Sequence, residues 1–361
     1  MRPLIDRRQF LGAAAASGIF SSAASAQTIP MPSVTPWPQG RTAAISLTFD
    51  DAMQTHLDNA GPILMKHGLR GTFFVITGAL NSWQKRIEDW KELAAEGNEI
   101  GSHTVNHPCL LKNIKFHSQS YTPEMMLKEI QDSCQDIVRR LGTHRGLTFA
   151  YPCGDMTFGP PGQQVRNQAR YLDYLAEYCF AARGYNSWAP VVPEDLNPLS
   201  VPVLGWTFGR DFPSLLATME PVRQGYHWGV FVFHGVGGQW LSIKSQTLDE
   251  LAGYLKGHGE IWTTTFGDAV RYIQEAKALV IGPGESTTHR ARFVLTWPLD
   301  PAIYDVPLTI KWRPPLPWRA CKIYADGAPV APLKSPTAAA ETMLVDVRPQ
   351  TKTLEFEAIP S

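Results

Sequence analysis

Two histidines four residues apart and a pair of adjacent aspartates carry the clearest chemical signal in this chain of 361 residues. His103 and His107 stand in the run Gly-Ser-His-Thr-Val-Asn-His, and Asp50-Asp51 precede them in the chain. Two neutral imidazoles and one carboxylate are a ligand set that zinc takes in proteins. Three ligands leave the fourth position open to water, which is typical of a hydrolytic site rather than a structural one. Each piece also has an ordinary explanation as a solvated turn or a surface histidine pair.

The segments before these residues should place them at strand ends. The run from Ala44 to Phe49 alternates and is rich in β-formers, so it predicts a strand that ends at the two aspartates. His103 follows a short segment, 98–102, that is entered from a helix-like stretch with a stop at Gly97. In folds built from βα repeats, the carboxyl ends of parallel strands meet on one face, which hosts the chemistry. We therefore expect the two clusters to meet in space.

The alternation of helix-like and strand-like segments over residues 41–278 sets the fold class. Residues 71–76 and 229–233 are apolar strand candidates. Thr122 begins a helix well, with proline next to it and an acidic residue in the first turn, and Gly142 ends it. Repeated βα units predict a parallel sheet, and a barrel is its compact closed form.

The last part of the chain has a different pattern. After a linker at 281–289, which contains a Gly-Pro-Gly run, residues 290–361 show short alternating segments and an Asp326-Gly327 hairpin signal. They predict a small antiparallel β-sandwich, with a role in packing or in carbohydrate contact. Residues 27–40 carry four prolines and should form an extended lead-in.

Residues 1–26 have the features of a targeting segment. The pair Arg7-Arg8 is a twin-arginine signal, and a weakly apolar Ala/Gly/Ser stretch leads to a small-residue cleavage site at residues 24–26. The stretch is too short and too rich in serine and glycine for a membrane span. We expect export by the twin-arginine route to the periplasm or the medium, with no stable membrane span after the signal is removed.

Composition narrows the partners. The chain has 33 basic and 33 acidic residues and no polybasic block, so nothing points to nucleic acid or to an anionic membrane surface. Its five cysteines form no Cys-x-x-Cys and no evident disulfide framework, and an odd number leaves at least one free thiol. Cys109 and Cys153 lie close in sequence to other candidate site residues, so a role as metal ligands stays open.

Several motifs together resemble a known family. Thr48-Phe49-Asp50-Asp51 and His103-Thr104-Val105-Asn106-His107 resemble the first two motifs of the polysaccharide deacetylases, carbohydrate esterase family 4. Tyr151-Pro152-Cys153-Gly154 is similar to the third, and Phe231 to Gly235 to the fifth, with matching order over about residues 40–275. The resemblance implies a distorted (β/α) barrel of seven rather than eight strands. It also implies a metal-dependent hydrolase that removes N-acetyl or O-acetyl groups from a polysaccharide or oligosaccharide.

The resemblance also implies roles for individual residues. Asp50 would be the base that takes a proton from water. The implied ligands of a divalent metal, zinc or another first-row metal such as cobalt, are Asp51, His103 and His107. His234 is the candidate general acid, because imidazole can hold a proton near neutral pH; the alternative is a buried structural histidine. Asp211 is the candidate to orient His234, although a surface acid would fit its sequence as well.

The third motif departs from the family pattern. That pattern has an arginine two residues before the proline and a tyrosine just after it, where this chain has Ala150 and Cys153. The arginine normally pairs with the base, so Asp50 must find another partner or titrate at higher pH. The tyrosine position lends its backbone N–H to the oxyanion, which Cys153 can still supply. Tyr151, Pro152 and Cys153 are thus predicted on the oxyanion and substrate side.

Aromatic side chains offer candidate sugar platforms, although most aromatics in a barrel lie in the core. The candidates are Trp188, Trp206, Trp240 and Tyr151.

Two other hypotheses stay open. A non-catalytic carbohydrate-binding protein with a vestigial barrel is favoured by the missing arginine and opposed by the intact aspartates and histidines. An oxygenase with iron on two histidines and one carboxylate lacks here its usual double-stranded β-helix pattern. Amide and ester substrates use the same machinery, so these residues leave the acetyl linkage open.

Overall fold

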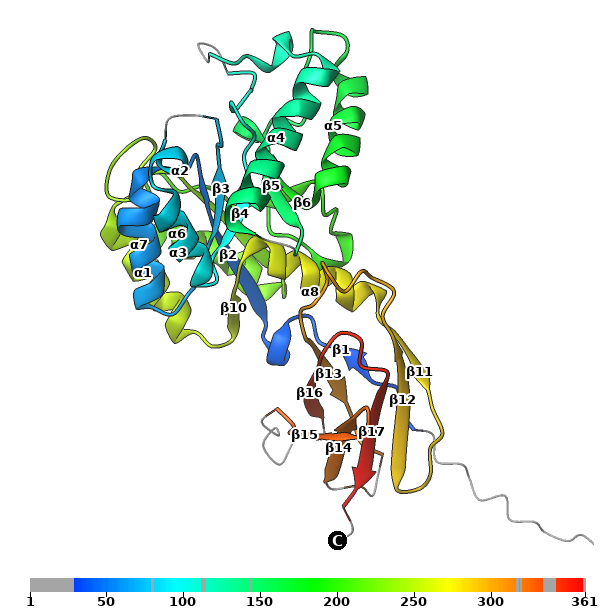
Figure 1. Cartoon of the computed structure of the whole chain (residues 1–361). Coiled ribbons are helices and arrows are strands. Elements are labelled where there is room, and N and C mark those ends of the chain that lie inside the picture. Colours follow the sequence, from blue (N-terminus) through cyan, green and yellow to red (C-terminus); the bar gives the residue numbers. More distant parts are fainter. Residues whose placement is uncertain are drawn as a thin grey trace, which may run out of the picture.

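The computed structural model describes residues 29–78, 81–111, 115–142, 145–315, 318, 320–333 and 342–359. The predicted targeting segment, 1–26, lies outside these ranges. Figure 1 shows an elongated molecule in which a lobe of strands and helices stands above a lobe of strands, with one long helix between them. Among the described helices, none is both long and apolar enough to cross a membrane.

Nine parallel strands form one curled sheet in the upper lobe. They are β2 (Ala43–Asp50), β3 (Thr72–Val75), β4 (Glu99–Ser102), β5 (Leu147–Ala150), β6 (Cys179–Trp188), β7 (Val201–Val203), β8 (Gly205–Trp206), β9 (Trp228–Phe233) and β10 (Ile261–Thr263). Only Leu204 separates β7 from β8, and its N–H donates to the carbonyl of Val230. Because β7 pairs with β6 and β8 pairs with β9, this stretch closes the sheet. If β7 and β8 are counted as one strand, the barrel has seven strands, and β10 lies beside the start of β2. The predicted distorted (β/α) barrel is confirmed.

Helices cover the outside of this barrel. They are α1 (Gly61–Lys66), α2 (Ser82–Lys85), α3 (Ile87–Ala95), α4 (Pro123–Leu141), α5 (Gln164–Tyr178), α6 (Phe212–Gln224), α7 (Ser245–Gly257) and α8 (Phe266–Ala278), with a π-helical turn η2 (His56–Ala60) before α1. The longest, α4, begins as expected: the hydroxyl of Thr122 accepts from the N–H of Met125. Gly142 ends it at φ 67°, a left-handed backbone that favours glycine.

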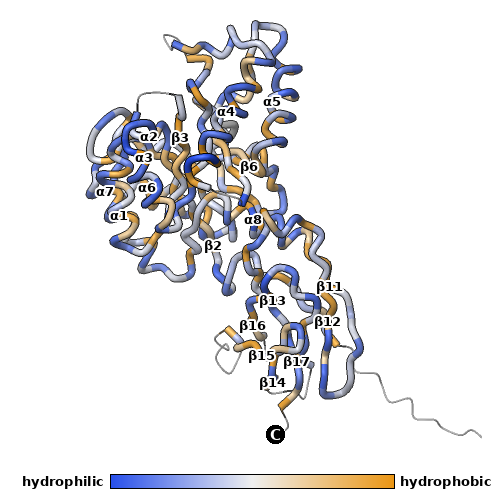
Figure 2. Tube along the Cα trace, viewed as in Figure 1, coloured by the Kyte–Doolittle hydropathy of each residue, from blue (hydrophilic) through white to orange (hydrophobic). Residues whose placement is uncertain are grey.

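The barrel core explains why β2 can carry charged residues at its end. All eight residues of β2 are buried, as expected for a strand covered on both faces. Between the barrel and the helices around it, the ring of Phe49 stacks on Phe73 at 4.7 Å and on Phe233 at 5.1 Å. Figure 2 shows apolar residues along these strands and polar residues on the outer helix faces. Packed aromatic rings thus fix the residue that directly precedes Asp50.

The lower lobe is the predicted antiparallel sandwich. One sheet has the order β1-β13-β16 and the other β11-β12-β17-β14-β15. Their bounds are β1 (Ser33–Val34), β11 (Val280–Pro283), β12 (Arg290–Thr296), β13 (Leu308–Trp312), β14 (Cys321–Ala325), β15 (Ala328–Val330), β16 (Met343–Val347) and β17 (Thr353–Ala358). Buried and exposed residues alternate strictly along β12, and Trp312 stacks on Phe356 at 4.2 Å between the sheets.

The proline-rich lead-in contributes a strand to this sandwich. Ser33 and Val34 pair antiparallel with Lys311 and Ile310. The sequence indicated an extended segment but not this partner.

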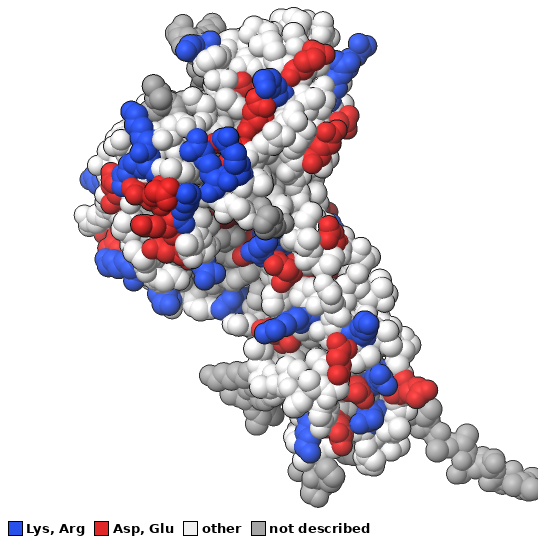
Figure 3. Space-filling view, viewed as in Figure 1, with Lys and Arg blue, Asp and Glu red and all other residues white. Residues whose placement is uncertain are grey.

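Figure 3 shows acidic and basic side chains interspersed over both lobes of the face in view.

Candidate active site

The structure brings together the three predicted metal ligands. Asp51 directly follows β2, and His103 directly follows β4. Nε2 of His103 lies 3.6 Å from Oδ1 of Asp51, and Nε2 of His107 lies 3.7 Å from the same oxygen. Ligands that are about 2.0–2.1 Å from a tetrahedral metal lie about 3.3–3.4 Å from one another. The three side chains are therefore spaced to close on one ion with small adjustments.

The donor atoms themselves fit a cation. Oδ1 of Asp51 is buried and is without a hydrogen-bond partner in the described part of the chain. Burial raises the pKa of Asp51 to about 6, although His234 and Arg183 nearby oppose this shift. Nδ1 of His103 donates to the carbonyl of Ala150 at 2.7 Å, so Nε2 keeps its lone pair toward Asp51. Burial also lowers the pKa of His103 to about 3, which favours the neutral, metal-binding imidazole.

A buried glutamate holds the loop between the two histidines. The carboxylate of Glu129, on α4, accepts hydrogen bonds from the N–H groups of Val105 and Asn106. It also accepts from the side-chain amide of Asn106 and the hydroxyl of Tyr121. Four hydrogen bonds to one carboxylate fix a loop that carries both metal ligands. The sequence analysis did not single out Glu129, because a glutamate inside a helix is usually a surface residue.

Backbone strain gathers at the same place. Residues with φ in the left-handed region include Asp51 (80°), Thr104 (67°), His107 (57°) and Cys153 (54°), none of them glycine. Such conformations persist where the surrounding contacts enforce them, and they cluster at functional sites. Here the hydroxyl of Thr104 accepts from the N–H of His107 at 2.9 Å and supports the second histidine.

The arginine missing from the third motif is supplied by the neighbouring strand. Nη2 of Arg183, on β6, donates to both carboxylate oxygens of Asp50 at 2.6 Å. Arg183 pairs in register with Ala150 on β5, so the guanidinium comes from beside the position that the motif would use. Burial opposes ionisation of Asp50, but Arg183, together with His103, lowers its pKa to about 2. The sequence analysis missed Arg183, since only the register of two strands reveals it.

His234, at the end of β9, faces the aspartates from the other side. Its Nε2 lies 3.9 Å from Oδ2 of Asp51. Nε2 of His56, on η2, donates to the backbone carbonyl of His234 at 2.9 Å and fixes the strand end. The ring of Trp206 stacks on His234, and Trp240 meets it edge-on, both at 5.5 Å.

The predicted partner of His234 does not reach it. Oδ1 of Asp211 accepts from the N–H of Ser214 at 3.0 Å and caps α6, and the side chain is exposed. Within the described ranges, no hydrogen bond or ion pair joins Asp211 to His234. Asp211 caps α6 instead, because an aspartate directly before Phe-Pro is a strong helix N-cap.

The third-motif residues divide between core and site. Tyr151 is fully buried, and its hydroxyl donates to the carbonyl of Leu199, so its ring cannot stack on a sugar. Pro152 is buried and begins the turn that carries Cys153. Cys153 forms a disulfide with Cys109, which corrects the expectation of no disulfide framework. In this state neither sulfur is a thiolate ligand.

The first part of the barrel matches a known protein family. A family model described as "Polysaccharide deacetylase" matches residues 39–176, from before β2 to α5. This part of the chain belongs to the polysaccharide deacetylase family. The match ends before Arg183 and His234, so the rest of the barrel completes the site of this polysaccharide deacetylase domain.

Two curated proteins are similar to the chain. A gellan lyase from a Bacillus species is 26% identical over an alignment of 324 residues, and the match covers 81% of this chain and 12% of that protein. A putative polysaccharide deacetylase, YxkH, from Bacillus subtilis is 27% identical over 111 residues, 30% of this chain and 37% of that protein. The chain thus spans well under half the length of either relative.

Solved structures give more distant similarities. A family 4 acetyl xylan esterase from Clostridium thermocellum with a cobalt ion has a TM-score of 0.40 and 19% identity, and the match covers 63% of this chain and 89% of that one. A mutant form of the peptidoglycan deacetylase PdaC from Bacillus subtilis has a TM-score of 0.41 and 20% identity, over 67% of this chain and 94% of that one.

Three tryptophans lie on the side of the site that His234 occupies. Trp188 is 57% exposed and Trp240 is 59% exposed. Trp206 lies between His234 and Trp188, with its ring 6.2 Å from that of Trp188. The three indole rings thus form an aromatic patch beside His234.

Proposed function

We propose that this chain is a metal-dependent hydrolase that removes acetyl groups from a polysaccharide or oligosaccharide. The proposal rests on one observation: the imidazole nitrogens of His103 and His107 lie close to Oδ1 of Asp51, a buried oxygen that has no hydrogen-bond partner among the described residues. Family membership supplies the reaction class. The metal is zinc or another first-row divalent ion, because two imidazoles and a carboxylate suit several of them.

Asp50 and His234 supply the proton transfers. A divalent metal at this site would polarise the acetyl carbonyl and make a bound water more acidic. Asp50, held ionised by Arg183, is placed 4.0 Å from Nε2 of His103 and can accept a proton beside the ligand set. His234 stands on the opposite side of Asp51 and can donate a proton to the leaving group.

The backbone of Cys153 is the candidate oxyanion donor. It follows the turn at Pro152 with φ 54°, and its sulfur lies close to His107. A main-chain N–H in a strained turn is a preorganised donor for charge that develops in the transition state.

The substrate is proposed to be a carbohydrate with its acetyl group on an amide or an ester. Trp188, Trp206 and Trp240 offer flat apolar surfaces for sugar rings. The names of the two curated relatives refer to polysaccharides. The non-catalytic hypothesis depended on a missing arginine, and Arg183 removes that support.

Acetate release tests this proposal. The full chain, freed of metal and then reloaded with zinc, cobalt or nothing, is incubated with chitin oligomers, peptidoglycan and acetylxylan. We expect acetate from at least one substrate, only with metal, and a loss of bound metal in His107→Ala. The matched control His289→Ala changes an exposed histidine of the sandwich and should behave as wild type. A metal-replete chain that binds a glycan and releases no acetate from any of them would be a binding protein instead.

We also propose that residues 1–26 direct export, on the strength of Arg7-Arg8 and the small-residue site at 24–26. Cell fractionation of the Arg7→Lys/Arg8→Lys variant should find the protein retained inside the cell. Unchanged export of that variant would reject the twin-arginine route.

A further inference from the structure

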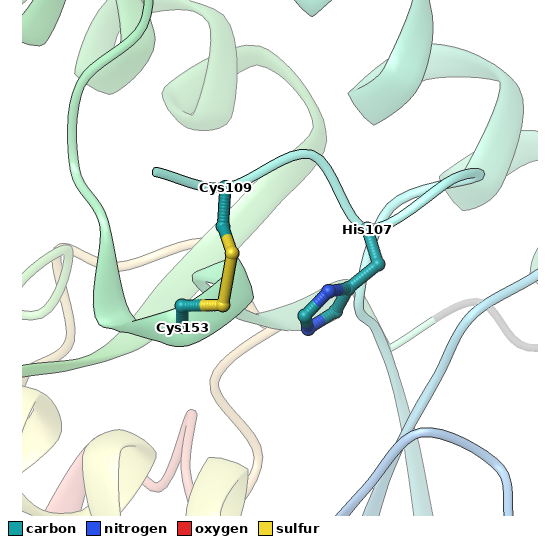
Figure 4. Close-up of side chains that lie close together, drawn as sticks. All are labelled: His107, Cys109 and Cys153. Atoms are coloured by element: carbon teal, nitrogen blue, oxygen red, sulfur yellow. A yellow bond between two sulfur atoms is a disulfide. The ribbon is translucent and has the colours of Figure 1, made fainter. Parts of the chain in front are cut away.

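A second set of possible metal ligands shares one residue with the first. His107, Cys109 and Cys153 each offer a donor atom, and these three atoms lie within 4.8 Å of one another. The same holds for Asp51, His103 and His107. In Figure 4 the ring of His107 lies beside the disulfide, on the same loop as Cys109. His107 is therefore common to an oxygen–nitrogen set and to a sulfur–nitrogen set.

The sulfur–nitrogen set is closed to metal while the disulfide is intact, because the thiolate is the form of cysteine that binds metal. Once the bond is broken, two thiolates and one imidazole are a familiar zinc and cobalt ligand set. Metal–sulfur bonds of about 2.3 Å and metal–nitrogen bonds of about 2.0–2.1 Å place such ligands about 3.5–3.8 Å apart. The present spacing of up to 4.8 Å leaves only small side-chain movements.

We propose that the Cys109–Cys153 disulfide controls which residues hold the metal. With the disulfide intact, the metal is bound by Asp51, His103 and His107. When a phosphine or dithiol reductant opens it, Cys109 and Cys153 join His107 and take the metal from the other set. This inference rests on the metal site of the proposed function.

A phosphine reduces the disulfide together with one water molecule. The disulfide takes up two electrons and two protons and becomes two thiols, while the phosphine and one water become a phosphine oxide. The two thiols then bind the divalent ion as thiolates and release two protons to the buffer.

Relocation of the metal should switch off hydrolysis. Thiolates bind zinc and cobalt more strongly than a carboxylate does, since they are softer ligands. They also donate more charge to the ion, so the ion polarises a carbonyl and acidifies water less. The ion would further be held away from Asp50, which Arg183 fixes on the side of Asp51 and His103.

Cobalt spectroscopy follows the ligands directly. The full chain is loaded with one equivalent of Co²⁺, either oxidised or after treatment with a phosphine that is then removed without oxygen. We expect thiolate-to-cobalt charge-transfer absorption in the reduced protein and none in the oxidised protein. Acetate release should fall by about tenfold or more in kcat/KM on reduction and return on reoxidation. A reduced protein that binds cobalt without this absorption overturns the proposal.

Matched cysteine variants locate the effect. Cys109→Ser/Cys153→Ser should show no charge-transfer absorption, and its rate should be the same before and after phosphine treatment, whatever that rate is. Cys321→Ser, a change of the same kind in the sandwich, should respond to reduction as wild type does. The double variant keeps the buried thiols of Cys134 and Cys179, so absorption that persists in it would assign the signal to them and reject the proposal.

The two proposals fail in different ways. If the oxidised protein releases no acetate but the reduced protein shows thiolate-bound cobalt, the hydrolase proposal fails and the ligand exchange stands. If the oxidised protein releases acetate and reduction changes neither rate nor spectrum, only the ligand exchange fails.

Discussion

Replacing Arg183 with methionine should damage the site more than any surface substitution. The side chain is fully buried, and Nη2 donates to both oxygens of Asp50 at 2.6 Å. Removing one partner of a buried ion pair costs about 3–5 kcal/mol of folding free energy. A hydrogen bond to a charged group is worth about 1.5–3 kcal/mol, which corresponds to a roughly 10- to 150-fold loss if it is lost in the transition state. We expect Arg183→Met to lower kcat/KM within that range.

The assay combines acetate release, urea unfolding and bound-metal analysis. Bound metal near the wild-type level would show that the ligand set is intact in Arg183→Met, and Arg223→Met, at a partly exposed surface pair, is the matched control. Because Ala150 and Arg183 are in register on β5 and β6, the double variant Ala150→Arg/Arg183→Met should recover part of the lost activity. If Arg183→Met keeps kcat/KM within about twofold of wild type and leaves the free energy of unfolding unchanged, the role assigned to this pair is wrong.

Three further substitutions test other parts of the structure. Glu129→Gln weakens the four hydrogen bonds that hold the loop carrying His103 and His107. In dialysis against a chelator, this variant should therefore lose its bound metal about 10- to 100-fold more readily than wild type. Equal retention of metal would contradict this role of Glu129. Asp211→Ala removes the cap of α6, so the free energy of unfolding in urea should fall by about 1 kcal/mol while kcat/KM stays unchanged. A large fall in kcat/KM would instead support the link between Asp211 and His234. Burial raises the pKa of Glu275 to about 8, so its charge opposes folding increasingly as the pH rises from the usual glutamate value to 8. Glu275→Gln should therefore gain little stability at pH 4 and about 3–5 kcal/mol at pH 8.5, and a gain that does not depend on pH would contradict the buried charge.

The strand ends and the barrel were predictable because their signals are local. Alternation before Asp50 and an apolar run before His234 each identify a strand and the face on which it ends. The helix over α4 followed from Thr122, Pro123 and Gly142, which act within a few residues of themselves.

Other features depend on which distant segments become neighbours. Arg183 belongs to the site only because β5 and β6 pair in a particular register. The Cys109–Cys153 bond requires two loops to meet at one end of the barrel. Asp211 was misjudged for the opposite reason, since its local role as a helix cap outweighs any attraction to a distant histidine. Patterns in a single sequence indicate local preferences, and they do not reveal which distant segments pair or in which register.

The pairing of β1 with β13 ties the earliest described strand to a strand that follows the whole barrel in the chain. Thr35 continues the pairing through Thr309, and the indole of Trp312 donates to the carbonyl of Pro30. A gene truncated after the barrel would leave residues 30–35 without these partners, and a gene for the C-terminal lobe alone would lack an edge strand. The segment that directly follows the predicted targeting sequence can therefore take its final place only after the barrel and β13 have been synthesised.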